Sequence, residues 1–381
     1  MKKPNVAVLG IGYHQLKAIK TLSKNYNIYG FDFNDNPIAK KKVTRFFNID
    51  LNNKEKILEI CKKNKIIKAF SFNSESPLKT VFFINNIICN ENKKLNLIQN
   101  KYLLRKKLKK NNLPTPNFLI LKNQKHLNKI QYPLVAKPIF GAGSRGVFIA
   151  KNKENFKKLY IKNKNFYKEK KLLIERYIPG TEYAADGWIE KNQKIIVGAI
   201  SKKKRSKGPE LFDESLIINF QNFYLYNNLK KFLKKLFQLL KLKNTVFHIE
   251  YKFYKKKIYL IDFSIRGAGF SVYSEILRKI INQNTDQILI DMFFNKDVKI
   301  NNSSKEIFFL FFLNYKKKKL LNDDKIYKKV SNLKTLSKIE FYKGITKLEK
   351  NSNLRYGHIL LSSYTKNILN EEIKLLRKIL D

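Results

Sequence analysis

The sequence predicts an α/β fold: a parallel α/β domain at the N-terminus, a mixed α+β region in the middle and an α+β extension at the C-terminus. Three observations predict it. Short apolar runs alternate with helix-length segments over residues 1–90, strand periodicity dominates residues 115–200, and strands and helices mix again over residues 305–381. A chain of 381 residues, 43% of them hydrophobic, can bury two or three cores.

The first 90 residues contain three strands and three helices in alternation. The expected strands are 5–12, 27–34 and 66–73, and the expected helices are 13–24, 54–64 and 76–87. This alternation predicts a parallel sheet wound right-handedly. Gly10, Gly12 and Asp32 are spaced as in a dinucleotide-binding turn. Gln15 stands where the third glycine would be, so the pattern does not favour a bound dinucleotide.

The remaining elements follow from periodicity and helix breakers. A basic helix at 98–112 is ended by Pro114 and Pro116, and the strand-rich region that follows includes one helix near 153–162. Further on, we expect helices at 227–242, 271–294 and 370–380, and strands at 245–253, 258–265, 306–315 and 356–364.

The charge of the chain is extreme, but its distribution points away from a binding arm. Lys and Arg number 79 against 30 acidic residues, which gives a net charge of +49. The lysines are scattered, and the longest run is Lys316–Lys319; the enriched residue types are those of A/T-rich codons. We therefore expect no specific nucleic-acid partner and no membrane partner. Cys61 and Cys89 have no metal or redox spacing, which suits a reducing cytoplasm.

The glycine-rich stretch "AKPIFGAGSRG" predicts a phosphate-binding flap. Gly141, Gly143 and Gly146 match a dinucleotide or kinase pattern by letter, but they join two strands and follow Lys137. Neither a Walker loop nor a kinase loop has its lysine there. Glycines let backbone N–H groups approach a phosphate, and the lysine would add a fixed charge. A glycine hairpin without a ligand remains the alternative.

The hairpin at 247–270 predicts a magnesium site. If Lys255–Lys257 form its turn, Tyr254 faces Ile258 and Glu250 lies opposite Asp262. His248, Ser264 and Arg266 then share their face, and the reverse face is apolar, with the side chains of Ile249, Tyr251, Phe253, Ile261, Phe263 and Ile265. Two facing carboxylates favour a cation between them, and Mg²⁺ takes such ligands together with phosphates. An ordinary hairpin with an Arg266–Asp262 ion pair is the alternative.

These motifs, in this order, resemble the ATP-grasp superfamily, and in particular its carbamoyl-phosphate-synthetase/biotin-carboxylase-like branch. The resemblance implies that Lys101, Lys137 and the glycine flap bind ATP phosphates. It places adenine against Glu175, Arg176, Tyr177 and Ile178, and ribose on Glu182. Glu250 and Asp262 match the magnesium carboxylates, and Arg266 matches the arginine at the reacting phosphate. Ser264 replaces the usual asparagine, and a serine hydroxyl is a weaker ligand for the second metal ion than the asparagine carbonyl.

The resemblance also implies a reaction and a domain layout. ATP would activate a small-molecule carboxylate as an acyl phosphate for attack by an amine, with ATP and one or two Mg²⁺ (or Mn²⁺) ions as cofactors and ADP as a product. Expected divisions are a first domain at 1–95, an ATP-grasp domain at 96–300 with its lid at about 115–185, and a C-terminal segment at 301–381. A homodimer is compatible with this layout.

Three alternatives remain at this stage. A small-molecule kinase or a carboxylase of the same fold would keep the ATP site and change the acceptor. A non-catalytic basic protein that binds nucleic acid or membrane is the third, although the acidic pair argues against it. The charged loop at 201–215 is expected to be solvated, with a substrate cover as its other interpretation.

Overall fold

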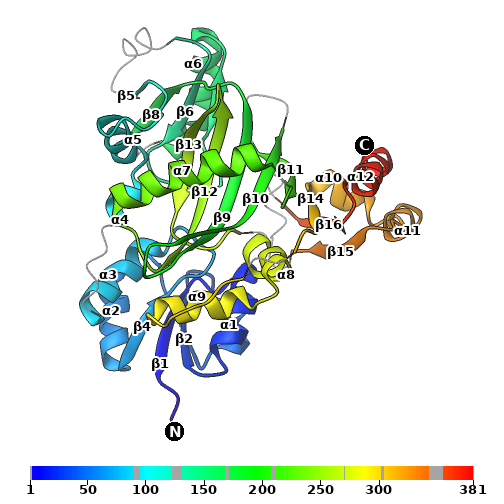
Figure 1. Ribbon diagram of the computed structural model, residues 1–381. Coiled ribbons are helices and arrows are strands. Elements are labelled where there is room, and N and C mark those ends of the chain that lie inside the picture. Colours follow the sequence, from blue (N-terminus) through cyan, green and yellow to red (C-terminus); the bar gives the residue numbers. More distant parts are fainter. Residues whose placement is uncertain are drawn as a thin grey trace.

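The computed structural model describes residues 2–89, 95–121, 131–141, 143–167, 171–206, 212–220, 222–269, 271–301, 304–342 and 355–380. Three sheets organise these residues. In Figure 1 the N-terminal domain lies at the bottom, the lid at the upper left and the C-terminal elements at the right, with the long core strands between them. No helix in the described part of the chain is long and apolar enough to cross a bilayer.

The N-terminal domain is the predicted parallel α/β unit. Its four strands are all parallel and lie in the order β3-β2-β1-β4. The elements are β1 (Asn5–Leu9), α1 (Leu16–Leu22), β2 (Asn27–Asp32), β3 (Arg45–Asn48), α2 (Lys54–Lys63), β4 (Ile66–Phe70) and α3 (Leu78–Ile88). The sequence reading missed β3, because four residues with both ends exposed carry no clear period.

Gln15 occupies the point of this sheet where a dinucleotide would otherwise bind. The strand order reverses between β1 and β4, and ligands of open α/β sheets bind at such points. The Gln15 amide donates to Ser74 Oγ over 3.0 Å and accepts from the backbone N–H of Phe72 over 3.1 Å. A Cβ at Gly10 would meet Gln15 Nε2 at 2.9 Å. The Gln15 side chain thus fills the turn next to Gly10.

The lid is a separate four-stranded antiparallel sheet in the order β5-β8-β6-β7. It is preceded by the helices α4 (Leu95–Gln99) and α5 (Lys101–Lys110). Its elements are β5 (Phe118–Leu121), β6 (Leu134–Pro138), β7 (Phe148–Ala150), α6 (Lys153–Asn163) and β8 (Leu172–Arg176). A small core that includes Phe148, Phe156 and Ile174 holds α6 against the sheet.

The core sheet has eight strands in the order β13-β12-β9-β10-β11-β14-β16-β15. The first five are β9 (Thr181–Ile189), β10 (Ile195–Arg205), β11 (Asp213–Ile218), β12 (Thr245–Tyr254) and β13 (Lys257–Ser264). Helix α7 (Phe223–Leu240) packs on one face of this sheet, where Leu233 and Phe237 of the helix share a core with Phe247 of β12. The opposite face is apolar where it meets the N-terminal domain, around Trp188 and Val246, and polar beyond that contact.

The long helix expected at 271–294 is wrong, because the chain forms three pieces there. A π-helical turn (Val272–Leu277) leads into α8 (Arg278–Ile281), and α9 (Thr285–Phe293) follows. Asn282 adopts a left-handed conformation with φ of 52°, which ends α8. The Asn284 side chain then caps α9 by accepting from the backbone N–H groups of Asp286 and Gln287.

The C-terminal residues extend the core sheet. Strand β14 (Ile307–Leu313) pairs with β11, and β16 (Gly357–Ser363) and β15 (Leu336–Phe341) follow outward. Helices α10 (Tyr315–Leu320), α11 (Asp324–Ser331) and α12 (Lys366–Leu380) complete this part, and α11 and α12 share an apolar core with the strands.

Candidate active site

Lys101, the first residue of α5, joins the flap to the acidic hairpin. Asn100 caps the helix by accepting from the N–H of Leu103. From that position Lys101 Nζ reaches the carbonyl oxygen of Gly141 at 2.8 Å and Asp262 Oδ1 at 2.9 Å. Three motifs that are separate in the sequence, the basic helix, the flap and the hairpin, therefore meet at one ammonium group.

The flap between β6 and β7 has three glycines with positive φ, of which two lie beside open space and one packs against Phe166. Gly141, Gly143 and Gly146 have φ values of 129°, 69° and 72°, a region that side chains disfavour. A Cβ at Gly141 or Gly143 would meet nothing within 4 Å, whereas one at Gly146 would lie 2.8 Å from Phe166 Cβ. Open space beside Gly141 and Gly143 leaves room for a ligand against the backbone.

Lys137, on β6, is buried beside a carboxylate. Its Nζ lies 2.6 Å from Glu175 Oε2, and Arg105 Nε lies 2.7 Å from Glu175 Oε1. Burial lowers the pKa of Lys137 to about 8, although Glu175 opposes the shift. We call Lys101, Arg105, Lys137 and Glu175 the lid cluster. Sequence reasoning missed Arg105, whose only signal is its place one turn after Lys101 on the same helix.

The hairpin places Glu250 opposite Asp262, as predicted, but by a different turn. Only Lys255 and Lys256 form the turn, with φ of 46° and 60°, and Tyr254 pairs with Lys257. Two left-handed residues suit a tight hairpin because their twist matches that of the strands. The predicted three-residue turn is therefore wrong, and a bulge at Ile261 restores the expected register at Glu250.

The bulge changes which apolar side chains are buried. Ile258 and Leu260 join the core under α7, while Ile261, which was expected there, is half-buried. The Ile261 carbonyl oxygen instead accepts hydrogen bonds from Arg105 Nη2 at 2.8 Å and from Lys137 Nζ at 3.4 Å. The irregularity thus attaches the lid cluster to the edge strand of the core sheet.

A second group of charges lies on the core sheet. We call Glu182, Lys203, Arg205, Asp213, Glu250 and Arg355 the core cluster. Lys203 Nζ lies 2.6 Å from Glu250 Oε1, 3.5 Å from Glu182 Oε1 and 3.6 Å from Asp213 Oδ2. Burial opposes it, but these three carboxylates raise the pKa of Lys203 above its usual value.

Two arginines complete the core cluster. Arg205 Nη1 lies 2.6 Å from Asp213 Oδ1, and Arg355 Nη2 lies 3.0 Å from Asp213 Oδ2. The expectation of a solvated loop at 201–215 is wrong for its ends, because residues 201–205 belong to β10 and 213–215 to β11. Lys203 is 7% exposed, since the strand pairs on both sides. Residues 207–211 lie outside the described part of the chain.

His248 lies on the same sheet face as Glu250 and is held from the neighbouring strand. Its Nδ1 is 2.8 Å from Asp186 Oδ1 on β9, and its Nε2 is 3.6 Å from Glu250 Oε1. Burial opposes it, yet Asp186 raises the pKa of His248 to about 9. The imidazole is therefore a cation at neutral pH and adds to the positive charge around Glu250.

Ser264, the last residue of β13, and Arg266, two residues beyond it, both contact the N-terminal domain. The Ser264 hydroxyl and Arg266 Nε donate to Glu75 Oε2, the latter over 2.8 Å. Asp262 has its ion pair with Lys101, so the alternative of an Arg266–Asp262 pair is not what the structure shows. Sequence reasoning missed Glu75. Its signal is its place just beyond β4, at the carboxyl edge of the parallel sheet.

The segment from Glu175 to Ile178 joins the lid to β9. The Glu175 side chain points into the lid cluster. Lys252 Nζ donates to the Ile178 carbonyl oxygen over 2.8 Å and lies 4.1 Å from the centre of the Tyr177 ring. Arg176 is exposed at the end of β8. These contacts fix the segment between the two sheets, and a role in adenine binding stays a prediction.

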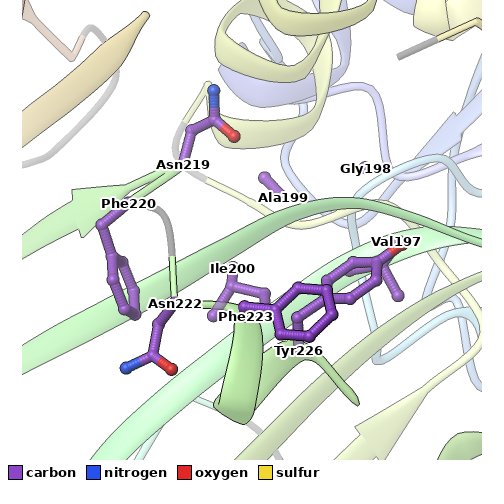
Figure 2. Close-up of a pocket in the computed structure, with 9 residues that line it drawn as sticks. All are labelled: Val197, Gly198, Ala199, Ile200, Asn219, Phe220, Asn222, Phe223 and Tyr226. Carbon is purple, nitrogen blue, oxygen red and sulfur yellow. The ribbon is translucent and has the colours of Figure 1, made fainter. Parts of the chain in front are cut away.

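Two further observations concern a cavity and the clustering of metal-binding side chains. A cavity of about 270 Å³ lies where β10 and β11 meet the start of α7. None of the predicted site residues lines this cavity. Figure 2 shows the residues that do: Val197, Gly198, Ala199, Ile200, Asn219, Phe220, Asn222, Phe223 and Tyr226. Within the described residues, no three His, Cys, Asp or Glu side chains gather as a metal site. A metal at Glu250 and Asp262 would take its remaining ligands from water or substrate phosphates.

Comparison with known proteins concerns the domain and the fold. Residues 130–274 match the family model of the ATP-grasp domain. No curated protein matches the chain. Among solved structures, an L-amino acid ligase from Bacillus licheniformis is similar with a TM-score of 0.79, 17% identity and coverage of 100% of this chain and 98% of the other.

Two other solved structures contain nucleotide. The ADP complex of an N5-carboxyaminoimidazole ribonucleotide synthetase has a TM-score of 0.77, 13% identity and coverage of 99% and 97%. The ATP complex of a carboxyaminoimidazole ribonucleotide synthase from Aspergillus clavatus has a TM-score of 0.76, 15% identity and coverage of 100% and 98%. The similarity in fold extends over essentially the whole length of each protein. Residues 130–274 of the chain therefore match an ATP-grasp domain, and the chain as a whole has a fold similar to that of these solved structures.

Proposed function

We propose that this protein is an ATP-dependent carboxylate–amine ligase that forms ADP. The proposal is supported by the ATP-grasp domain at 130–274 and by the fold, which is similar to that of proteins named as ligases and synthetases, some of them in complex with ADP or ATP. Its partners are a small-molecule carboxylate and a small-molecule amine. We place the reaction in the cytoplasm, because the cysteine usage suits a reducing compartment.

The single observation that carries the proposal is the position of Lys101. Its ammonium contacts the flap at Gly141 and the hairpin at Asp262, at 2.8 and 2.9 Å. A cation between a glycine flap and an acidic hairpin is suited to a nucleoside triphosphate, whose phosphates need both positive charge and close backbone approach.

We assign ATP binding to the lid and to the segment that follows it. The lid cluster contains three cations and one carboxylate, so it can attract phosphates. The backbone of Gly141, Gly143 and Gly146 would approach the phosphates. The segment 175–178 would line the adenine, and Glu182, now 3.5 Å from Lys203, would bind the ribose.

Glu250 and Asp262 fit a magnesium site that substrate phosphates complete. They lie directly opposite each other on adjacent strands, and their side chains are 24% and 32% exposed. Mg²⁺ commonly binds one or two carboxylates together with phosphates, and when bound it neutralises charge on the transferring phosphoryl group. The Ser264 hydroxyl donates to Glu75, so these contacts support one ion more directly than two.

The reaction has two steps. A carboxylate oxygen attacks the γ-phosphorus of ATP and the bond to the β-phosphate oxygen breaks, so ADP leaves. The amine, which must first lose a proton to solvent if it enters as an ammonium, then attacks the acyl carbon through its nitrogen. The carbon–oxygen bond to phosphate breaks, phosphate leaves, and the nitrogen loses a further proton to solvent. Arg266 would donate to the phosphoryl group as its charge develops. These steps require no protein nucleophile.

Trapping with hydroxylamine tests the reaction class. With a suitable carboxylate and Mg-ATP, hydroxylamine should give a hydroxamate with ADP in equal amount and no AMP. Arg266→Ala should lose about 10²- to 10³-fold in this rate at saturating ATP, because the arginine acts in the transition state. Pools of carboxylates, screened by ADP release, supply the substrate.

The other outcomes distinguish the alternatives. AMP as the product would replace this mechanism with adenylation. A stable phosphorylated product that ignores amines would favour a small-molecule kinase, and incorporation of bicarbonate would favour a carboxylase. A thermal shift with oligonucleotide but none with Mg-ATP would favour a non-catalytic basic protein.

A further inference from the structure

The loop that follows β4 presents a carboxylate to the candidate active site from the N-terminal domain. Glu75 lies beyond the carboxyl end of β4, on the side of β1 where the strand order reverses. Gln15 already fills the crevice behind this loop through its bonds to Ser74 and Phe72. Glu75 is thus a charged residue at the edge of the N-terminal domain that faces the ATP-grasp domain.

Two residues of the ATP-grasp domain hold the Glu75 side chain in place. Ser264 Oγ and Arg266 Nε both donate to Oε2, and the side chain is 19% exposed. The backbone N–H of Gly267 also bonds to the Phe72 carbonyl oxygen at 3.3 Å, so the two loops are attached to each other. Both side-chain donors contact Oε2, which leaves Oε1 for a substrate.

Glu75 lies next to the C-terminal end of β13, and this position determines which substrate groups it can contact. Asp262, Ser264 and Arg266 are spaced two apart at the end of that strand, with Lys101 and the flap beside Asp262. A phosphoryl group between Lys101 and Arg266 would therefore have Glu75 on its far side from the lid. The nucleophile must approach the acyl carbon from a side that ATP does not occupy.

Charge balance indicates which group Glu75 would bind there. In the absence of substrates its partner is Arg266, at 2.8 Å. Once Arg266 donates to a phosphoryl group, Glu75 shares the positive charge of Arg266 with that anion. A second cation beside Glu75 would then stabilise its carboxylate. An ammonium group supplies the charge and three donors in a compact form.

We propose that Glu75 binds the amine substrate, which enters as a primary ammonium, and that Ser264 positions this carboxylate. The inference rests on the proposed function, because it assigns the second substrate of that reaction. It makes the N-terminal domain the part of the molecule that selects the nucleophile, and the lid the part that binds ATP.

Glu75→Gln tests the assignment with two nucleophiles of different charge. Hydroxylamine is uncharged at neutral pH, whereas the twenty L-amino acids, used as an equimolar mixture, carry ammonium groups. The carboxylate is the one that gives most hydroxamate with the wild-type protein. We expect the variant to form hydroxamate within about twofold of the wild-type rate, while amide formation with amino acids at subsaturating concentration falls at least about tenfold.

Hydroxamate formation also serves as the control for folding and for Arg266. A parallel fall of both products would mean that Glu75 only supports Arg266, and it would overturn the assignment. Unchanged amide formation would overturn it too, as would a wild-type protein that makes hydroxamate but no amide with the amino-acid mixture. A wild-type protein that makes neither product would instead refute the ligase function, and the assignment with it.

A matched variant tests whether the loss of an ion pair with the N-terminal domain is enough to change the ratio of amide to hydroxamate. Glu275 lies 2.7 Å from Lys17 of the N-terminal domain and 3.0 Å from Lys338 of β15. Glu275→Gln should leave the amide-to-hydroxamate ratio within about twofold of wild type. Glu75→Asp keeps the charge on a shorter side chain and should restore part of the ratio. An equal loss of the ratio in Glu275→Gln would count against the proposal.

Discussion

The lid cluster and the core cluster are built from the same residue types but differ in charge balance. The lid cluster combines three cations with one carboxylate. The core cluster combines three cations with three carboxylates, and each carboxylate has a cation within 3.6 Å. Even when Asp262, which pairs with Lys101 at 2.9 Å, is counted with the lid, the lid has one more cation than carboxylates, whereas the charges of the core cluster balance.

This difference shows which ligand each region can accept without rearrangement. An anion such as a triphosphate can enter the lid cluster and reduce its excess charge. A cation can bind at Glu250 only if it competes with Lys203, which lies 2.6 Å away. We infer that ATP binding precedes metal binding at Glu250, or brings the metal with it. The predictions below test the two regions in turn.

The largest expected effect is at Asp262, where the two regions meet. Asp262→Asn should reduce ATP turnover at least about 10³-fold, which corresponds to about 4 kcal/mol in activation free energy. The free energy of unfolding should change by less than about 1 kcal/mol, because the pair with Lys101 is partly exposed. Steady-state ADP release and urea denaturation measure the two quantities. Near-full turnover would remove Asp262 from the mechanism.

Removal of one lysine from each region should affect stability unequally. Lys203→Met removes the cation that lies 2.6 Å from Glu250 and should lower the free energy of unfolding by about 3 to 5 kcal/mol, because His248 Nε2 is more distant, at 3.6 Å. Lys137→Met should cost less, because Glu175 keeps Arg105 at 2.7 Å. Urea denaturation followed by circular dichroism gives both values. Equal losses would show that charge balance does not distinguish the regions.

The smallest expected effect is a pH dependence of ATP binding from the lid. Because the pKa of Lys137 is lowered to about 8, its ammonium loses its proton as the pH rises above that value. ATP affinity should be constant below about pH 7.5 and should fall about tenfold towards pH 9.5. Calorimetric titration across this range measures it.

Lys137→Arg provides the control for this titration, because arginine stays charged throughout the range. Its affinity for ATP should vary little with pH, and its far-ultraviolet circular dichroism should match that of the wild type. A decline with pH in the arginine variant equal to that of the wild type would place the titrating group elsewhere.

Much of the fold and part of the candidate site could be predicted from the sequence. Alternation of strands and helices over residues 1–90 predicted the parallel sheet, because the winding rule needs only the order of elements. The opposition of Glu250 and Asp262 was confirmed, since a period of two fixes which side chains share a face. The identification of an ATP-grasp fold was confirmed by the family match and by the similar structures.

Only the tertiary structure decided which partners these residues have. Arg105 and Glu175 are 70 residues apart, and Arg266 and Glu75 are 191 apart, yet both pairs are in contact. The pattern of a single element does not predict such pairs, because an ion pair forms only where the packing of two elements brings the charged atoms within about 4 Å of each other. Burial of Lys203 and the bulge at Ile261 have the same origin. Both depend on which strands flank β10 and β13, and the pattern of a single strand does not contain that information.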